Sequence, residues 1–491
     1  MIWFRYLILA GVILTTASGQ EFALDRIIVK LAPDISRSDF SSMLDTNNYV
    51  VEKVLVRRLN IISIKLKNNQ ISPLDAIKEF RNNPFVDKAI PDTKVSRRDM
   101  PDDMQFDQQW ALHNVGQSGG TEDADIDAPE AWDIATGGIT PLGDTIVVAI
   151  IDGGMLLTHA DLTPNLWTNW GEIPGNGIDD DNNGYVDDVH GWDAYSSDGS
   201  VPSDGHGTHV AGIVGAKGNN GVYVAGVNWD VKLMPIAGSS GTTSIVLEAY
   251  GYALDQRAIY DSTDGSSGAF VVATNSSFGV NNADCSSGNY SLWNDMYDAL
   301  GQYGILSCGA TMNNNSNVDV TGDVPTGCES EYMISVTNTT RNDSKNSGAA
   351  YGATTIDLGA PGTQILSTYT GGGTPSLTGT SMASPHVAGS VGFLHASMSA
   401  GFASFFQSNP TEGGLLIKQL ILDGTDPLPT LNGVTVSGGR LNLYNSALLS
   451  MDTMAADSLD PNPVTSVTAD TTEWYRVTLN WNDPTELFGG D

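Results

Sequence analysis

Between residues 102 and 449, short apolar segments alternate with longer stretches of helical periodicity. The segment Val147–Ile151 is apolar and mostly β-branched, which is typical of a strand that is buried on both faces. Val210–Val214 and Met382–Leu394 are apolar enough to be buried helices. Strands and helices that alternate at this spacing predict an α/β fold, in which a mostly parallel sheet is covered by helices on both faces and forms three layers.

Residues 21–98 have a different pattern, in which short strands and helices follow one another in the order β-α-β-β-α-β. Ser72 followed by Pro73 is typical of a helix start, because serine caps free N–H groups and proline fits the first turn. We therefore predict a small α+β unit before the larger one. Its expected elements are strand Arg26–Leu31, helix Ser36–Leu44, two strands within Val50–Leu66 around a turn at residues 58–60, a helix from Ser72 to about Asn82, and strand Val86–Ala89.

The N-terminal residues indicate export. Arg5 precedes an apolar run, Tyr6–Leu14, and small residues follow at Ala17–Gly19. This pattern predicts a signal peptide at residues 1–19 and a secreted protein. The apolar run is short for a membrane span and no other segment qualifies, so we expect no membrane association, with a retained N-terminal anchor as the alternative.

The C-terminal residues predict a linker followed by strands. Beyond Met451 the sequence becomes polar, and Val467 and Trp474–Trp481 then alternate as strand residues do. We expect residues 450–491 to hold a linker and the beginning of a β-sandwich. Because two strands cannot bury a core, we expect the sequence to be a fragment of a longer protein.

The net charge of −34 is distributed unevenly. Residues 21–98 hold 14 lysines and arginines against 10 aspartates and glutamates, whereas residues 99–491 hold 8 against 47. A segment as acidic as the second repels nucleic acid and anionic membranes, so we expect neither as a partner. The opposite charge of the first segment predicts that it docks on the second.

Three short motifs each carry one member of an aspartate, histidine and serine set. Asp152 ends the apolar strand, at the carboxyl edge of the predicted sheet, where active sites gather. Ser381 begins an apolar helix, whose free N–H groups and positive dipole end favour a developing oxyanion. Because a serine hydroxyl needs a base to become nucleophilic, His206 is the candidate base and Asp152 the carboxylate that orients it.

The motifs around these residues resemble the signature of the subtilisin-like serine peptidases, whose triad follows this order. They are Val147–Gly153, Asp204–Gly212 and Gly379–His386, and the resemblance extends from about Asp103 to Leu449. It implies a peptidase domain with a seven-stranded sheet at residues 102–449. It also implies a ferredoxin-like propeptide at residues 20–98, which acts as inhibitor and chaperone, and a processing linker at Lys94–Pro101. An independent accessory domain is the alternative for residues 20–98. The C-terminal strands resemble the opening of a fibronectin type III-like domain.

The resemblance also implies an oxyanion hole and a substrate-binding edge. Asn313 matches the oxyanion asparagine, although Met312 stands where the family has glycine, so Asn314 or a shifted register is the alternative. The segment Ser277–Phe278–Gly279 resembles one wall of the primary specificity pocket, and Ser239–Thr243 resembles the opposite substrate-pairing edge.

Two loops predict structural calcium. In the first, oxygen-bearing side chains alternate around a glycine as in part of an EF-hand, with Asp179, Asp181, Asn183 and Asp187 as ligands and His190 where an EF-hand has glutamate. A solvated acidic turn is the alternative. The second loop rests on the resemblance alone, which implies Asp161, Asn220 and the carbonyls of Val222 and Val224 as ligands, with Asp103 as a further contributor.

Three cysteines fit an exported protein with one disulfide and one free thiol. Cys308 lies in a predicted central strand, which leaves Cys285 and Cys328, both in loops, as the expected pair.

The sequence as a whole predicts a secreted, calcium-stabilised serine endopeptidase that acts on polypeptides, binds its own propeptide and is a monomer. A catalytically silent binding protein on the same scaffold and a peptide ligase or cyclase that uses the same acyl-enzyme are the alternatives.

Overall fold

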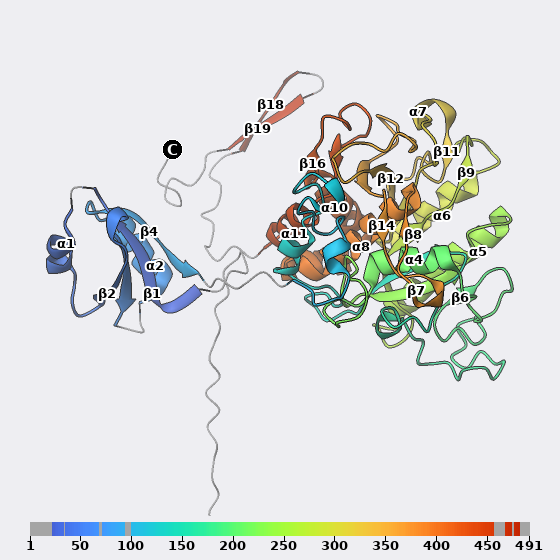
Figure 1. Cartoon of the computed structure of the whole chain (residues 1–491), viewed down its shortest axis with the longest axis horizontal. Coiled ribbons are helices and arrows are strands. Elements are labelled where there is room, and N and C mark those ends of the chain that lie inside the picture. The colour runs from blue at the N-terminus through green and yellow to red at the C-terminus, as the bar shows by residue number, and fades with distance from the viewer. Residues whose placement is uncertain are drawn as a thin grey trace, which may run out of the picture. The chain divides into compact units, whose positions relative to one another are not determined.

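The computed structural model describes residues 22–33, 35–67, 71–93, 100–455, 467–473 and 476–481. The chain forms two compact units (Figure 1), one with residues up to Arg97 and from Ala456 onward, and one from Arg98 to Ala455. The expected signal peptide and most of the expected processing linker lie outside the described residues.

The N-terminal part of the first unit contains a four-stranded antiparallel sheet in the order β2-β3-β1-β4. Alternate side chains of β1 and β3, such as Val29 and Ile64, are buried with Phe40 of α1 and Phe80 of α2 in one core. The elements are β1 (Phe22–Leu31), α1 (Arg37–Met43), β2 (Tyr49–Val56), β3 (Ile61–Leu66), α2 (Pro73–Arg81) and β4 (Val86–Thr93).

The C-terminal strands form a separate pair. Strand β18 (Val467–Glu473) runs antiparallel to β19 (Arg476–Trp481). The relation of this pair to a fibronectin type III-like domain stays a prediction.

The larger unit is built on a nine-stranded sheet in the order β16-β17-β13-β12-β10-β8-β5-β7-β6. The strands from β17 to β6 are parallel, and β16 is antiparallel to β17. The strands are β5 (Ile146–Asp152), β6 (Trp192–Asp193), β7 (Lys232–Ala237), β8 (Phe270–Ser276), β10 (Leu306–Ala310), β12 (Met333–Thr339), β13 (Leu358–Pro361), β16 (Asp426–Pro427) and β17 (Gly439–Arg440).

The expectation of a seven-stranded sheet is therefore wrong by two strands. Three of the nine strands have two residues each: β16 and β17 at one edge and β6 at the other. Such short strands have no alternation of apolar and polar residues that sequence analysis could detect.

Helices cover both faces of this sheet, which gives the predicted three layers. On one face, Val148 and Ile150 of β5 lie in the same core as residues of α3, α4, α8, α9, α10 and α11, and on the other face Val147 and Ile151 lie with residues of α5 and α6. The helices are α3 (Ala128–Trp132), α4 (Gly205–Gly215), α5 (Thr243–Ser262), α6 (Ser291–Gln302), α7 (Val318–Thr321), α8 (Thr380–Ser397), α9 (Ala400–Ser408), α10 (Pro410–Asp423) and α11 (Leu443–Asp452).

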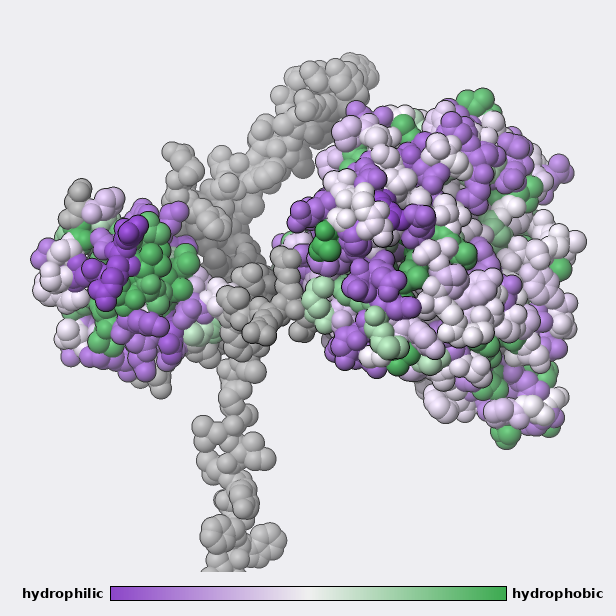
Figure 2. All heavy atoms as spheres, viewed as in Figure 1, coloured by the Kyte–Doolittle hydropathy of each residue, from purple (hydrophilic) through white to green (hydrophobic). Residues whose placement is uncertain are grey.

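Two short antiparallel pairs flank the main sheet. The first joins β9 (Val280–Asn281) to β11 (Asp323–Val324), and the second joins β14 (Ile365–Leu366) to β15 (Ser376–Leu377). None of the helices in the described ranges is both long and apolar enough to cross a lipid bilayer. Figure 2 shows apolar residues scattered among polar ones on the drawn face of the larger unit.

Candidate active site

Asp152 and His206 form a hydrogen-bonded pair at the carboxyl edge of the sheet. Asp152 is the last residue of β5, and His206 is the second residue of α4. The His206 Nδ1 atom lies 3.0 Å from Oδ1 and 2.9 Å from Oδ2 of Asp152. A histidine that donates from Nδ1 keeps Nε2 free to accept a proton.

Small residues and a helix cap hold this pair in position. A Cβ atom on Gly207 would lie 2.0 Å from the carbonyl oxygen of Gly154, so that glycine lets α4 approach the end of β5. The side chain of Asp204 caps the helix by accepting a hydrogen bond of 2.8 Å from the Gly207 N–H. The cap fixes the first turn of α4, which carries His206.

The surroundings of His206 favour its protonated form. Burial lowers the pKa of His206, but the hydrogen bond and the charge of Asp152, together with the charge of Asp204, outweigh that effect and place the pKa above its usual value. The imidazole is therefore a better proton acceptor than a free histidine.

Ser381 is the second residue of α8, which packs against α4, β5 and β8. Its hydroxyl donates a hydrogen bond of 3.4 Å to the carbonyl oxygen of Ser277, and the Ser277 hydroxyl donates one of 3.0 Å to the carbonyl oxygen of Ser381. The serine is thus held against the segment that the sequence predicts to bind substrate, at the N-terminus of a long helix.

Of the two candidate oxyanion asparagines, Asn313 is bonded beside Ser381. The Asn313 amide oxygen accepts hydrogen bonds from the Thr380 N–H (3.0 Å) and the Thr380 hydroxyl (3.2 Å), which leaves the amide N–H groups as donors. Asn314 contacts the sulfur of Met312 and the Ser316 N–H instead. The geometry therefore favours Asn313 over Asn314.

A cavity of about 200 Å³ opens next to Ser381. Its walls include the predicted substrate-binding residues Ser277, Phe278 and Gly279 and the segment 310–314, with Asp323 between them. The other expected edge begins at Ser239, whose N–H donates a hydrogen bond of 3.2 Å to the carbonyl oxygen of Asp152. The segment 277–279 thus lies beside Ser381, and Ser239 lies beside Asp152.

Sequence analysis did not identify Asp323. The residue is 2% exposed, and its carboxylate accepts a hydrogen bond of 2.6 Å from the Thr326 hydroxyl. It follows Gly322 in a polar stretch of short elements. No spacing in the sequence connects it with the triad.

The first predicted calcium loop brings three carboxylates together. Ligand atoms of Glu172, Asp179 and Asp181 all lie within 4.8 Å of one another. The main-chain N–H of Asn183 donates to Asp179 (3.0 Å) and to Asp181 (3.1 Å). Glu172 was missed because it precedes the motif by seven residues, in a position with no metal-ligand spacing.

Asp187, which was expected to be a ligand in this loop, lies outside that group. Its carboxylate accepts hydrogen bonds from the N–H groups of Asn176 (3.1 Å) and Gly177 (2.8 Å). Asp187 has a φ angle of 54°, in the left-handed region, and the turn directs its side chain toward a different part of the loop.

The second predicted calcium loop closes around a buried aspartate. Asp161 is fully buried, and its carboxylate accepts hydrogen bonds from Asn220 Nδ2 (3.2 Å) and the Val224 N–H (3.0 Å). The Val222 N–H donates to the Asn220 side chain (2.7 Å). The predicted ligand residues therefore belong to one connected group.

Asp103 approaches the same loop from the beginning of the larger unit. Its Oδ2 accepts a hydrogen bond of 2.7 Å from the Asn219 N–H, while its buried Oδ1 has no hydrogen-bond partner among the described residues. A buried carboxylate oxygen without a partner is costly and has the chemistry of a calcium ligand.

A disulfide joins Cys285 to Cys328, the pair expected from the sequence. Cys308 is a buried free thiol in β10.

Several known proteins with similar sequences are proteases. The chain is 32% identical over 342 residues to an extracellular protease of Xanthomonas campestris pv. campestris, and this match covers 65% of this chain and 53% of that protein. It is 32% identical over 275 residues to thermitase of Thermoactinomyces vulgaris, and this match covers 55% of this chain and 79% of that protein. The chain thus spans about half the length of the Xanthomonas relative.

Structural comparison gives the same fold. A solved protease structure from Pseudoalteromonas arctica PAMC 21717 matches with a TM-score of 0.51 and 25% identity, over 72% of this chain and 100% of that one. The sequence model of the subtilase family matches residues 143–431, which are more than half of the 491 residues, and the chain therefore belongs to the subtilase family.

Proposed function

We propose that the protein is a secreted serine endopeptidase, stabilised by calcium, that hydrolyses peptide bonds through an acyl-enzyme. The observation that carries the proposal is the position of the bonded Asp152–His206 pair, at the sheet edge where α4 and α8 begin and Ser381 lies beside a cavity. The family and its protease relatives support the same activity.

In the first half of the reaction, the Ser381 hydroxyl leaves the Ser277 carbonyl and passes its proton to Nε2 of His206 while Oγ attacks the scissile carbonyl carbon. The resulting oxyanion accepts hydrogen bonds from the Asn313 amide and the Ser381 main-chain N–H. His206 then gives the proton to the leaving amine as the C–N bond breaks, which leaves an ester on Ser381.

In the second half, water attacks the ester after giving a proton to His206. The proton returns to Ser381 Oγ when the C–O bond breaks and the carboxylic acid product leaves. Asp152 accepts the Nδ1–H bond throughout and stabilises the imidazolium each time it forms.

Residues 20–98 act, in this proposal, as a propeptide that inhibits the peptidase unit until it is cleaved off. This part of the chain has an excess of positive charge, while residues 99–491 are strongly acidic. It also exposes apolar side chains, including Leu55, Leu59 and Ile90, and Figure 2 shows apolar residues gathered on the drawn face of this unit. Complementary charge and exposed apolar area both favour docking.

Calcium would be held by two groups of oxygen ligands. The loop with Asp161, Asn220 and the carbonyls of Val222 and Val224 fits the ion, since Asp103 adds a buried oxygen that has no other partner in the part of the chain that the structure describes. In the acidic loop, Glu172, Asp179 and Asp181 lie close together, and Asn183 would complete the group. Both ions would hold loops in place and take no part in the chemistry.

The test is to express the whole chain in calcium beside Ser381→Ala, with Ser376→Ala, an exposed serine on β15, as the matched control. We expect wild type and Ser376→Ala to lose the segment up to about residue 98, measured by intact mass, and to cleave casein, while Ser381→Ala does neither. Folded but inert wild-type protein would instead favour a silent binding module. Products joined to an added amine acceptor would favour a peptide ligase.

A further inference from the structure

We propose that Asp323 makes the peptidase select lysine or arginine as the residue immediately before the scissile bond. This inference rests on the proposed function and names the substrate class that the cavity next to Ser381 recognises.

We call strands β9 and β11, which contribute Asn281 and Asp323 to the lining, the floor of the cavity. Asp323 faces Asn281, and Val324 faces Val280, in the antiparallel pair of β11 and β9. A Cβ atom on Gly279 would lie 2.2 Å from the Val324 carbonyl oxygen, so that glycine lets the wall 277–279 lie directly on this floor. Asp323 is thereby held in one position relative to Ser381.

The Asp323 carboxylate has room for a further donor. It accepts from the Thr326 hydroxyl and from the N–H groups of Met312 and Val324. An ionised carboxylate offers about four acceptor positions, so these three contacts do not saturate it. Burial raises the pKa of Asp323 to about 7 because these contacts only partly compensate the loss of water.

A cation in the cavity would supply the missing compensation. Among the described residues that line the cavity, Asp323 is the only one with a carboxylate, and none is a lysine, arginine or histidine. A buried charge is costly until it is paired. A cavity of about 150 Å³ already holds a benzene molecule, so that a volume of about 200 Å³ has room for a long basic side chain.

The experiment compares two peptides that differ only before the scissile bond, where one has lysine and the other norleucine, which lacks the ammonium group. We expect wild type to cleave the lysine peptide with the higher kcat/KM. Asp323→Asn, which keeps the shape of the side chain, should lower the lysine-to-norleucine ratio of kcat/KM by about 10- to 100-fold, as expected for loss of a hydrogen bond between charged groups.

The matched control is Asp284→Asn. Asp284 is exposed in the loop after β9, so this variant removes one negative charge from the same region without changing the cavity. We expect its ratio to equal that of wild type. All assays are repeated in about 1 M sodium chloride, where the Debye length of about 3 Å removes long-range attraction to the acidic unit.

Two results would overturn the inference. Wild type could prefer norleucine, or Asp323→Asn could leave the ratio unchanged, for example by slowing both peptides equally, as a purely structural role requires. If folded wild type cleaves neither peptide nor casein, the proposed function itself fails. Cleavage of the norleucine peptide without preference for lysine counts against this inference alone.

A second measurement on wild type covers the case in which Asp323→Asn does not fold. Benzamidine is a planar cation of suitable size, and benzamide is its neutral counterpart. We expect benzamidine to inhibit competitively at concentrations at least about 10-fold lower than benzamide. Equal inhibition by the two compounds would contradict a role for the Asp323 charge.

Discussion

The disulfide between Cys285 and Cys328 ties together the two segments that continue from the floor of the cavity. Cys285 lies four residues after β9 ends at Asn281, and Cys328 lies four residues after β11 ends at Val324. The bridge lies outside the lining of the cavity and restrains the strand pair that carries Asp323. Apart from the bridge, the two strands are paired over only two residues each.

Removal of the disulfide should destabilise the larger unit. The two cysteines are 43 residues apart, and closing a loop of that length in the unfolded chain corresponds to about 3–4 kcal/mol. We expect Cys285→Ala with Cys328→Ala to lower the free energy of unfolding in urea by that amount, measured in the Ser381→Ala background to prevent self-digestion.

The control for the disulfide is chemical. Dithiothreitol should destabilise the Ser381→Ala protein but leave the variant that also lacks Cys285 and Cys328 unchanged, because Cys308 is a free thiol in both. A shift of equal size in both proteins would show that the reductant acts elsewhere.

The pH dependence of the reaction should reflect His206. Its pKa lies above the usual value because the bond to Asp152 and the charges of Asp152 and Asp204 outweigh burial. Since neutral imidazole is the base, kcat/KM falls as the pH drops through this raised pKa. We expect the acid limb of the pH profile to lie above about 6.5, the ordinary histidine value.

Asp152→Asn provides the comparison. It removes the charge that raises the pKa of His206, so that the acid limb should move to lower pH, and kcat should fall by about 10⁴-fold, as in other serine, histidine and aspartate triads. An acid limb at the same pH in both proteins would show that a different group titrates.

Much of the larger unit could be predicted because its elements depend on their own residues. The run Val147–Ile151 is apolar along its whole length, and β5 is buried on both faces there. Asp152, His206 and Ser381 each lie at an element end within a long local motif, and Asp152 and His206 are hydrogen-bonded to each other.

The features that sequence analysis missed depend on contacts between distant loops. Asp323 lies in the cavity because β11 pairs with β9, more than forty residues earlier in the chain. Glu172 reaches the acidic loop from outside its motif, and the carboxylate of Asp187 binds N–H groups in a different part of the loop. Propensity and spacing along the chain do not encode such approaches.

Removal of calcium should lower stability, and Asp103 should contribute to the effect. An ion at a concentration of 100 times its Kd stabilises the folded state by about 2.7 kcal/mol. We expect EDTA to lower the unfolding free energy of the Ser381→Ala protein by about this amount, and Asp103→Asn to weaken the response.

Asp102→Asn is the matched control for the calcium experiment. Asp102 is the exposed neighbour of Asp103. Its carboxylate accepts a hydrogen bond of 2.8 Å from the N–H of Gly221, in the loop that carries Asn220. A response to EDTA that is as weak in Asp102→Asn as in Asp103→Asn would indicate a general effect of charge. An unchanged response in Asp103→Asn would remove that residue from the proposed ligand set.

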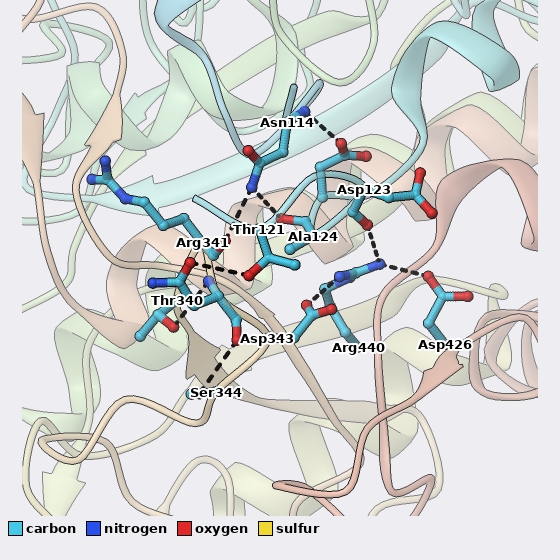
Figure 3. A network of polar contacts seen from close by, with 12 residues as sticks. Asn114, Thr121, Asp123, Ala124, Thr340, Arg341, Asp343, Ser344, Asp426 and Arg440 are labelled. Carbon is cyan, nitrogen blue, oxygen red and sulfur yellow. Dashed lines mark hydrogen bonds and ion pairs between the residues drawn. The ribbon is translucent and has the colours of Figure 1, made fainter. Parts of the chain in front are cut away.

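Arg440 lies on β17, next to the edge strand β16, and should be a major source of stability in the larger unit (Figure 3). Its side chain is 3% exposed and pairs with Asp343 and, at 2.6 Å, with Asp426. It also donates to the Asp123 carbonyl (3.3 Å). One cation thus connects the beginning of the unit to the turn after β12 and to strand β16.

Arg440→Met removes the cation and leaves two partly buried carboxylates next to each other. Loss of one partner from a buried pair costs about 3–5 kcal/mol, and we expect the lower end because Asp343 and Asp426 are 30% and 31% exposed.

Arg341→Met is the control. Arg341 lies in the same network, but among the described residues its side chain donates only to the Ser118 carbonyl and to Gln364, so that we expect a loss of about 1 kcal/mol. Addition of Asp343→Asn and Asp426→Asn to Arg440→Met should restore part of the lost stability, because the repulsion between the carboxylates is then gone. Equal losses for the two arginine variants, measured by urea unfolding in the Ser381→Ala background, would mean that the buried charge of Arg440 stabilises the unit no more than an ordinary hydrogen-bonding side chain does.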